Sequence, residues 1–313
     1  MELIRGLHNL RPRHRGCVAT IGAFDGVHLG HQAVIRHLLD KARELGLPSV
    51  VIVFEPLPRE YLLPLKAPAR LMSFREKFRA LEALGVDRVL RIRFTEALRN
   101  MTAQAFADTV FVAGLGVRAL VLGDDFRFGN DREGDLQFLR EQGRRHGYEA
   151  GPTPTFELAG ERVSSTRVRK ALADADFELA ERLLSRPYSI AGKVVYGRQL
   201  GRELGFPTAN MELHRLRAPL SGVYVVSVRG AGLEQTHGVA NVGTRPTVND
   251  SIKANLEVHL LDRNCNLYGK HIEVTFLHKV RDEQKFDAIP QLREQIGKDI
   301  ATARDWLAGH ATQ

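Results

Sequence analysis

Two histidines and three glycines stand close together near the start of the chain, in Thr20-Ile-Gly-Ala-Phe-Asp-Gly-Val-His-Leu-Gly-His31. The spacing His28-x-x-His31 puts both imidazoles on one face of a helical turn, where they can donate hydrogen bonds to one polyphosphate. Glycines let the backbone approach such an anion, and the N–H groups at a helix start favour it. A tight turn with two solvated histidines is the alternative. The spacing alone leaves both interpretations open.

Two later stretches also carry side chains that could belong to a binding site. Gly123-Asp-Asp-Phe-Arg-Phe-Gly129 follows an apolar run and is either a polar loop with two stacking aromatics or part of a site at a strand end. Val163-Ser-Ser-Thr-Arg-Val-Arg169 has hydroxyl residues that commonly cap helices. Its two arginines also match phosphate oxygens well, because the guanidinium fork can donate two parallel hydrogen bonds.

The second half holds two further stretches. Gly197-Arg-Gln-Leu-Gly-Arg-Glu-Leu-Gly-Phe-Pro-Thr-Ala-Asn210 is glycine-rich but lacks the Gly-Lys-Ser/Thr ending of a P-loop. In the run from Ala254 to Asp262, alternation puts Leu256, Val258 and Leu260 on one face of a strand and Glu257 with His259 on the other. An ordinary solvated glutamate is the alternative to a functional one.

Strands alternate with helices in the first half of the chain. We expect strands at 17–21, 49–54, 89–94 and 119–122, and helices at 32–45, 73–84, 102–112 and 176–184. This order predicts a parallel sheet with helices on both faces, and ligands then bind beyond the carboxyl ends of its strands. The helical pattern breaks at Arg186-Pro187, so we place one domain at 1–186 and a second at 187–313.

In the second half we expect short strands of alternating pattern at 188–195, 222–229, 236–242, 253–261 and 271–277. Their spacing predicts a small closed antiparallel barrel. A helix over 290–307, with Leu292, Ile296, Ile300 and Ala303 on one face, is expected to pack on it.

Composition is that of a globular protein, with 43% hydrophobic and 26% charged residues and a net charge of +8. The basic residues are spread along the chain without interleaved aromatics, so we expect phosphate-bearing substrates and no nucleic-acid partner. No apolar run is long enough for a membrane span, and we see no signal peptide. Cys17 and Cys265 lie far apart, which argues against a disulfide and for a cytoplasmic location. His, Cys, Asp and Glu show no zinc-like spacing.

The three N-terminal motifs, in this order, resemble the adenylyl-transferring nucleotidyltransferases, and among them the FAD synthetase module of bacterial bifunctional riboflavin kinase/FAD synthetases. The resemblance implies a Rossmann-like domain in which His28 and His31 are catalytic. It implies ATP and phosphate contacts from Gly22, Phe24, Asp25, Gly30, Ser164, Ser165, Thr166 and Arg169, and FMN contacts from Asp125, Phe126 and Phe128. One departure is Leu57 in Phe54-Glu-Pro-Leu-Pro58, where the family often has histidine.

The run ending in Pro-Thr-Ala-Asn210 and the Leu-Glu-x-His context of Glu257 resemble the riboflavin kinase module of the same family. The resemblance implies that Glu257 is the catalytic base and that Thr208 and Asn210 hold Mg²⁺ and the ATP phosphates. It also implies ATP or flavin contacts from Gly201, Gly205, Pro207 and Arg281.

Together the motifs imply an enzyme that phosphorylates riboflavin with ATP to FMN, then adenylylates FMN with ATP to FAD and pyrophosphate. Small-molecule substrates, a Mg²⁺ requirement and a monomer or weak homo-oligomer are expected. Three alternatives stay open: an enzyme with one activity, a nucleotidyltransferase for another phosphate-bearing acceptor, and a non-catalytic basic protein that binds nucleic acid or flavin.

Overall fold

A computed structural model describes residues 1–197, 201, 204–213, 215–246, 252–263 and 265–310. Contacts divide the chain into two compact units, one of residues 1–68 and 74–164 and one of residues 69–73 and 165–313. The predicted boundary between two functional domains at residue 186 stays a prediction. None of the described helices is long and apolar enough to cross a membrane.

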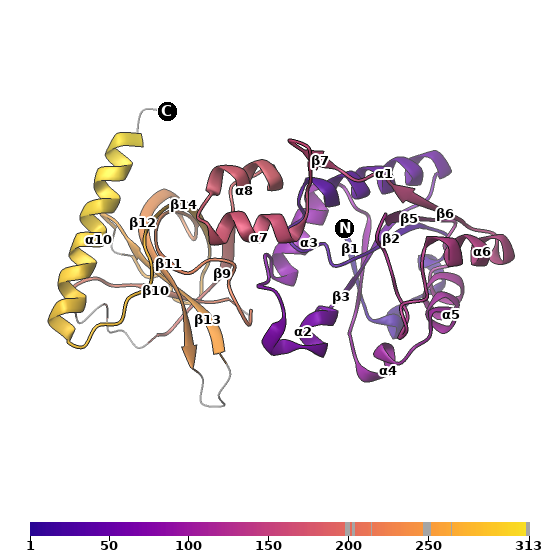
Figure 1. Ribbon diagram of the computed structural model, residues 1–313, viewed down its shortest axis with the longest axis horizontal. Helices are drawn as coiled ribbons and strands as arrows, with labels where there is room; N and C mark the ends of the chain where they lie inside the picture. Colours follow the sequence, from indigo (N-terminus) through magenta and orange to yellow (C-terminus); the bar gives the residue numbers. More distant parts are fainter. Residues whose placement is uncertain (198–200, 202–203, 214, 247–251, 264, 311–313) are drawn as a thin grey trace. The chain divides into compact units, whose positions relative to one another are not determined.

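The first unit is built on a six-stranded parallel sheet (Figure 1). Its strands are β1 (Glu2–Arg5), β2 (Val18–Ile21), β3 (Ser49–Phe54), β4 (Arg88–Ile92), β5 (Ala119–Gly123) and β6 (Glu149–Thr153). The order across the sheet is β1-β4-β3-β2-β5-β6. The chain therefore leaves β2 toward β3 on one side and later returns with β5 on the other. This reversal makes the carboxyl ends of β2 and β5 the expected ligand position.

The elements that connect these strands are α1 (Leu29–Leu45), α2 (Pro58–Leu62), α3 (Phe74–Ala83), α4 (Glu96–Arg99), α5 (Ala103–Phe106), a π-helical segment η4 (Ala107–Gly114) and α6 (Leu136–His146). Short 3₁₀ turns are η1 (Leu7–Asn9), η2 (Pro12–His14) and η3 (Pro64–Lys66), and β7 (Glu157–Leu158) pairs with β8 (Glu161–Arg162). The predicted single helix at 102–112 is thus α5 continued by η4. The prediction omitted β1, β6 and α6.

The second unit is a closed barrel of described strands in the order β10-β13-β12-β11-β14-β9, all antiparallel. Its strands are β9 (Ser189–Val195), β10 (Ala209–Glu212), β11 (Gly222–Gly230), β12 (Leu233–Pro246), β13 (Ile252–Leu260) and β14 (His271–Arg281), with helices α7 (Ser165–Ala173), α8 (Phe177–Leu184) and α10 (Ile289–His310). The predicted barrel is confirmed, with β10 as a strand that the prediction omitted.

Helix α10, yellow in Figure 1, lies along the barrel and buries Ala303 against Val223 and Val225 of β11 and Val239 of β12. The barrel unit also holds the segment 69–73. The Tyr188 hydroxyl donates to the carbonyl of Leu71 at 3.1 Å, and Arg215 Nη1 donates to the same carbonyl at 3.0 Å. These bonds explain why five residues from the first half of the sequence pack with the second unit.

Both cysteines are free, as expected. Cys17 directly precedes β2 and is buried, and this burial raises the pKa of its thiol to about 12. A thiol with such a pKa stays protonated at neutral pH and is a poor nucleophile. Cys265 is exposed.

Candidate active sites

The turn from β2 to α1 is a strained stretch of backbone in the first unit. Phe24 has φ +44° and Val27 has φ +43°, in the left-handed region that side-chain-bearing residues rarely adopt. Both side chains are almost fully buried, so packing holds the backbone in this shape. Such strain costs about 1–3 kcal/mol per residue and concentrates at functional sites.

His28 and His31 meet at the start of α1, as their spacing predicts. His28 is the residue before the helix, and its Nδ1 accepts a hydrogen bond from the backbone N–H of His31 at 3.3 Å. The two imidazoles are stacked, with ring centroids 3.7 Å apart, and the ring of Phe24 lies 5.1 Å from that of His31. The helix begins at Leu29, three residues earlier than predicted, so its first turn carries the glycine and the second histidine.

Gly30 lets another segment approach this helix start. A side chain there would place its Cβ 3.0 Å from the carbonyl oxygen of Val163. Ser164 follows Val163 directly, so part of the Ser-Ser-Thr motif lies next to the histidines. Ser165, Thr166 and Arg169 belong to α7 in the second unit, where Arg169 Nε donates to the carbonyl of Ala69 at 2.5 Å. Gly22 donates its N–H to Ile52 in β3 at 3.1 Å, and Asp25 is buried.

The predicted site residues in the loop after β5 lie partly at the surface and partly in the core. Asp125 is exposed and forms an ion pair with Arg162 at 3.1 Å, and Asp124 accepts from the same guanidinium at 3.0 Å. Phe126 is half-buried and stacks on Phe128 at 5.4 Å. Phe128 itself is buried among the aromatic rings of Phe106, Phe111 and Phe138. Phe128 thus belongs to a buried aromatic cluster on which Phe126 stacks. Its predicted contact with FMN stays a prediction.

A pocket of about 470 Å³ in the barrel unit gathers most of the predicted residues of the second half. Gly201, Thr208, Asn210, Glu257 and Arg281 line it. Asn210 of β10 stands directly beside Glu257 of β13 in the strand register. Glu257 Oε1 accepts from the Asn255 amide at 3.0 Å, and the His259 ring contacts the Pro207 carbonyl at 2.9 Å. Leu256, Val258 and Leu260 are buried on the opposite face, which confirms the predicted alternation.

Arg281 is held at this pocket by a carboxylate that the motifs did not indicate. Asp299 of α10 is buried and accepts from Arg281 Nε and Nη2, both at 2.8 Å. Gln295 donates to the same carboxylate at 2.9 Å, and the guanidinium lies 5.8 Å from the ring centroid of Phe286. The Arg281 side chain is therefore fixed in a charge-assisted pair.

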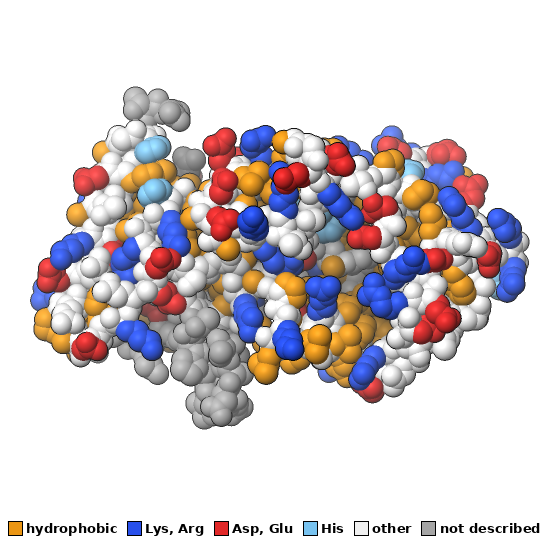
Figure 2. Space-filling model, viewed as in Figure 1, with side chains coloured by type: hydrophobic (Ala, Val, Ile, Leu, Met, Phe, Trp, Pro, Cys, Tyr) orange, Lys and Arg blue, Asp and Glu red, His pale blue; other side chains and the backbone are white. Residues whose placement is uncertain are grey.

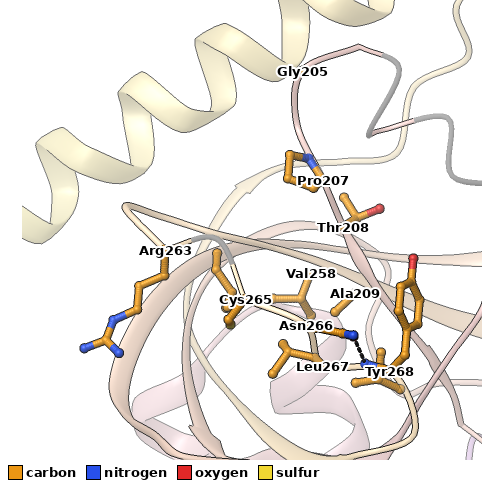
Figure 3. A pocket seen from close by; sticks show the side chains of 12 residues that line it. Gly205, Pro207, Thr208, Ala209, Val258, Arg263, Cys265, Asn266, Leu267 and Tyr268 are labelled. Carbon is orange, nitrogen blue, oxygen red and sulfur yellow. Dashed lines mark hydrogen bonds between the residues drawn. The ribbon is translucent and has the colours of Figure 1, made fainter.

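A second pocket of about 610 Å³, drawn in Figure 3, lies on the other side of the segment formed by residues 205–210. Residues alternate between the two pockets: Phe206, Thr208 and Asn210 face the first, whereas Gly205, Pro207 and Ala209 face the second. Thr208 lines both. Parts of the predicted glycine-rich stretch, residues 198–200 and 202–203, lie outside the described residues.

Thr208 and Asn210 offer neutral side-chain oxygens, and a hard cation such as Mg²⁺ prefers oxygen ligands to nitrogen or sulfur. Asn210 Oδ1 is buried and accepts no hydrogen bond from any group that the structure describes. An unsatisfied buried acceptor is costly, and Mg²⁺ prefers such oxygen ligands. A Cβ at Gly197 would lie 2.5 Å from the Asn210 amide, so the glycine leaves room for this side chain. No cluster of three His, Cys, Asp or Glu suited to a metal occurs in the described part of the chain.

Charges of both signs are mixed on the surface. The face shown in Figure 2 carries both blue Lys and Arg side chains and red Asp and Glu side chains, and both kinds are found across most of its width. This distribution agrees with the spread of charges along the sequence.

Comparisons with known proteins match both halves. A family model described as FAD synthetase matches residues 10–167, and one described as riboflavin kinase matches residues 184–307. A protein from Pseudomonas fluorescens named bifunctional riboflavin kinase/FMN adenylyltransferase is 54% identical over 99% of both chains. An Escherichia coli K12 protein of the same name is 50% identical over 98% of both.

A solved structure also matches the whole chain. It comes from Streptococcus pneumoniae, is named a macrolide-efflux protein, and matches with a TM-score of 0.77 and 31% identity over 98% of this chain and 100% of that chain. The likeness supports the fold of both units. The efflux activity in that name is not carried over to this chain.

Proposed function

This chain belongs to the family of bifunctional riboflavin kinase/FMN adenylyltransferases, and we propose a division of its two activities between the sites described above. It is an enzyme of flavin biosynthesis that phosphorylates riboflavin to FMN and adenylylates FMN to FAD. The barrel pockets carry the kinase reaction, and the start of α1 carries adenylyl transfer.

The arrangement of the two barrel pockets supports the assignment of the kinase reaction to them. Riboflavin occupies the 470 Å³ pocket beside Glu257, and ATP occupies the 610 Å³ pocket, with Thr208 on the wall between them. In this arrangement the ribityl hydroxyl and the γ-phosphate meet at Thr208 and Asn210. Arg281, fixed by Asp299, borders the flavin.

Kinase chemistry then needs a base and charge stabilisation. Glu257 accepts the proton of the ribityl 5′-hydroxyl as its oxygen attacks the γ-phosphorus, and the bond to the β,γ-bridging oxygen breaks to release ADP. Thr208 and Asn210 would hold Mg²⁺, which when bound offsets the charge of the phosphates. The buried Asn210 Oδ1 supports this assignment.

Adenylyl transfer has different needs. The FMN phosphate has a second pKa of about 6, so it is already ionised as it attacks the α-phosphorus of ATP. Donors must instead bring two anions together and stabilise the departing pyrophosphate. We assign this role to His28, His31 and the N–H groups that open α1, with Ser164 next to them. Arg162 orients Asp124 and Asp125 at the neighbouring strand end.

A single incubation tests both activities. Purified protein with riboflavin, ATP and Mg²⁺ is expected to form FMN first and FAD later, when flavins are separated over time. FMN alone, even when FMN is supplied directly, contradicts the adenylyltransferase assignment. Neither product from folded protein favours the binding-protein alternative, and salt-dependent binding of random DNA would then support that alternative.

Asn210 gives a separate prediction about the metal. Asn210→Ala removes one of the two proposed oxygen ligands, so the Mg²⁺ concentration for half-maximal FMN formation is expected to rise about tenfold. The Mg²⁺ dependence of FAD formation from FMN is the internal control and stays unchanged. An unchanged metal requirement for both reactions contradicts the assigned role.

We also propose a cytoplasmic location, no nucleic-acid partner and a monomer or weak homo-oligomer. Two free cysteines and the mixed surface charge support the first two statements.

A further inference from the structure

The wall of the 610 Å³ pocket contains a stacked pair of tyrosines. The rings of Tyr196 and Tyr268 are almost parallel, at 16°, with centroids 4.0 Å apart. Tyr268 lines the pocket (Figure 3), whereas Tyr196 does not. Tyr196 therefore covers one ring face of Tyr268, and the same side chain also borders the pocket.

This pair differs from the other tyrosines of the barrel unit. Tyr188 and Tyr224 are buried in the core, and their hydroxyl groups donate to the carbonyls of Leu71 and Ser221 at 3.1 and 2.7 Å. Tyr196 instead leaves 73% of its surface exposed. An aromatic ring that contributes little to the core, and that supports a second ring at a pocket, points to a role in binding.

The remaining lining of the pocket fits a flat aromatic group. Apolar side chains come from Val194, Ala209, Val258, Leu260 and Leu267. Asn266 Oδ1 accepts from the backbone N–H of Tyr268 at 3.1 Å and fixes the turn that carries the ring. Arg263 also lines this pocket, but Figure 3 shows its guanidinium pointing away from Thr208 and Tyr268.

We propose that Tyr268 stacks on the adenine of ATP in the kinase reaction, and that Tyr196 is a positioning residue that supports its ring. The inference rests on the proposed function, which assigns this pocket to ATP. Stacking on an aromatic side chain suits any nucleobase, because every base has a π-face. Tyr268 therefore contributes affinity for the base, while contacts elsewhere bind the phosphates.

The test is a comparison of Tyr268→Ala with Tyr268→Phe in the full-length enzyme. The alanine variant is expected to raise the KM for ATP in FMN formation about tenfold, the loss that one base stack produces. Its KM for riboflavin and its kcat stay within twofold of the parent. The phenylalanine variant keeps the ring and behaves like the parent. Tyr196→Ala raises the same KM by a smaller factor.

Two controls separate stacking from damage to the fold. The KM for ATP in FAD formation from FMN stays unchanged in every variant, because that reaction uses the other unit. Inorganic tripolyphosphate, which has no base, inhibits FMN formation with the same inhibition constant in Tyr268→Ala as in the parent. An equal loss of tripolyphosphate affinity overturns the proposal, because it shows a distorted pocket.

The other outcomes distinguish this inference from the proposed function. If Tyr268→Ala raises the KM for riboflavin and not for ATP, the two pockets have been assigned in reverse and both proposals fail. The exposed thiol of Cys265 lines the same pocket and reports occupancy directly. If ATP slows alkylation of Cys265 but Tyr268→Ala leaves both KM values unchanged, the pocket assignment stands and the stacking proposal is overturned.

Discussion

Glu257→Gln is expected to reduce FMN formation from riboflavin about a thousandfold and to leave FAD formation from FMN within twofold of the parent. A positioned general base contributes about 10²–10⁴ in rate, and the amide cannot accept the proton of the ribityl hydroxyl. Glutamine keeps the size of the side chain and an oxygen that accepts from the Asn255 amide. The barrel should therefore fold normally. Initial rates of both reactions, measured on one preparation, give the ratio that decides the result.

A matched control makes this ratio specific to the pocket. Glu234→Gln makes the same chemical change on β12 of the same barrel, at an exposed position that does not line the 470 Å³ pocket. Both activities should stay within twofold. If Glu257→Gln keeps its full rate of FMN formation, Glu257 is not the base, and another group near the ribityl hydroxyl must accept the proton. A fall in both activities with a lowered melting temperature would instead report a folding defect.

The orientation of Glu257 was predictable because strand alternation is a local property. Three apolar residues at every second position define the buried face, and the glutamate between two of them must face the other way. The stacked histidines were predictable for the same reason, since three residues nearly complete a helical turn. Their chemical roles came from the motif resemblance and not from the spacing.

The omitted strands depend on distant partners. β10 has four residues directly after Pro207 and Thr208, and only its pairing with β9 and β13 makes it a strand. β6 contains Gly151 and Pro152, which weaken any strand pattern. Proline is tolerated there because β6 is at the edge of the sheet. Local propensity is weak in both segments, so the fold around them determines the result.

The ion-pair partners at the two sites could not be predicted from the sequence either. Arg162 meets Asp124 across 38 residues, and Asp299 meets Arg281 across 18. The two members of each pair belong to different elements of the fold, so no local pattern in the sequence joins them. Asp299 lies in the predicted terminal helix, but its burial beneath Arg281 depends on how that helix packs against the barrel.

His31→Ala is expected to reduce FAD formation from FMN about a hundredfold while FMN formation stays within twofold of the parent. Removing one preorganised donor to a developing negative charge costs about 10²–10³ in rate. His31 is the better target of the two histidines. His28 accepts the N–H of His31 as the helix cap, and loss of a cap costs about 0.5–2 kcal/mol of stability by itself.

The control for this prediction is His146→Ala, an exposed histidine in the last turn of α6 in the same unit. It should leave both reactions unchanged. Equal loss of FMN and FAD formation in His31→Ala, at an unchanged melting temperature, contradicts separate sites, because His31 is not among the residues that line the two barrel pockets. A selective loss of FAD formation, together with a selective loss of FMN formation in Glu257→Gln, requires two independent centres. Two variants of one chain, each defective in one step, should then restore FAD synthesis from riboflavin when mixed, because FMN released by one variant is the substrate of the other.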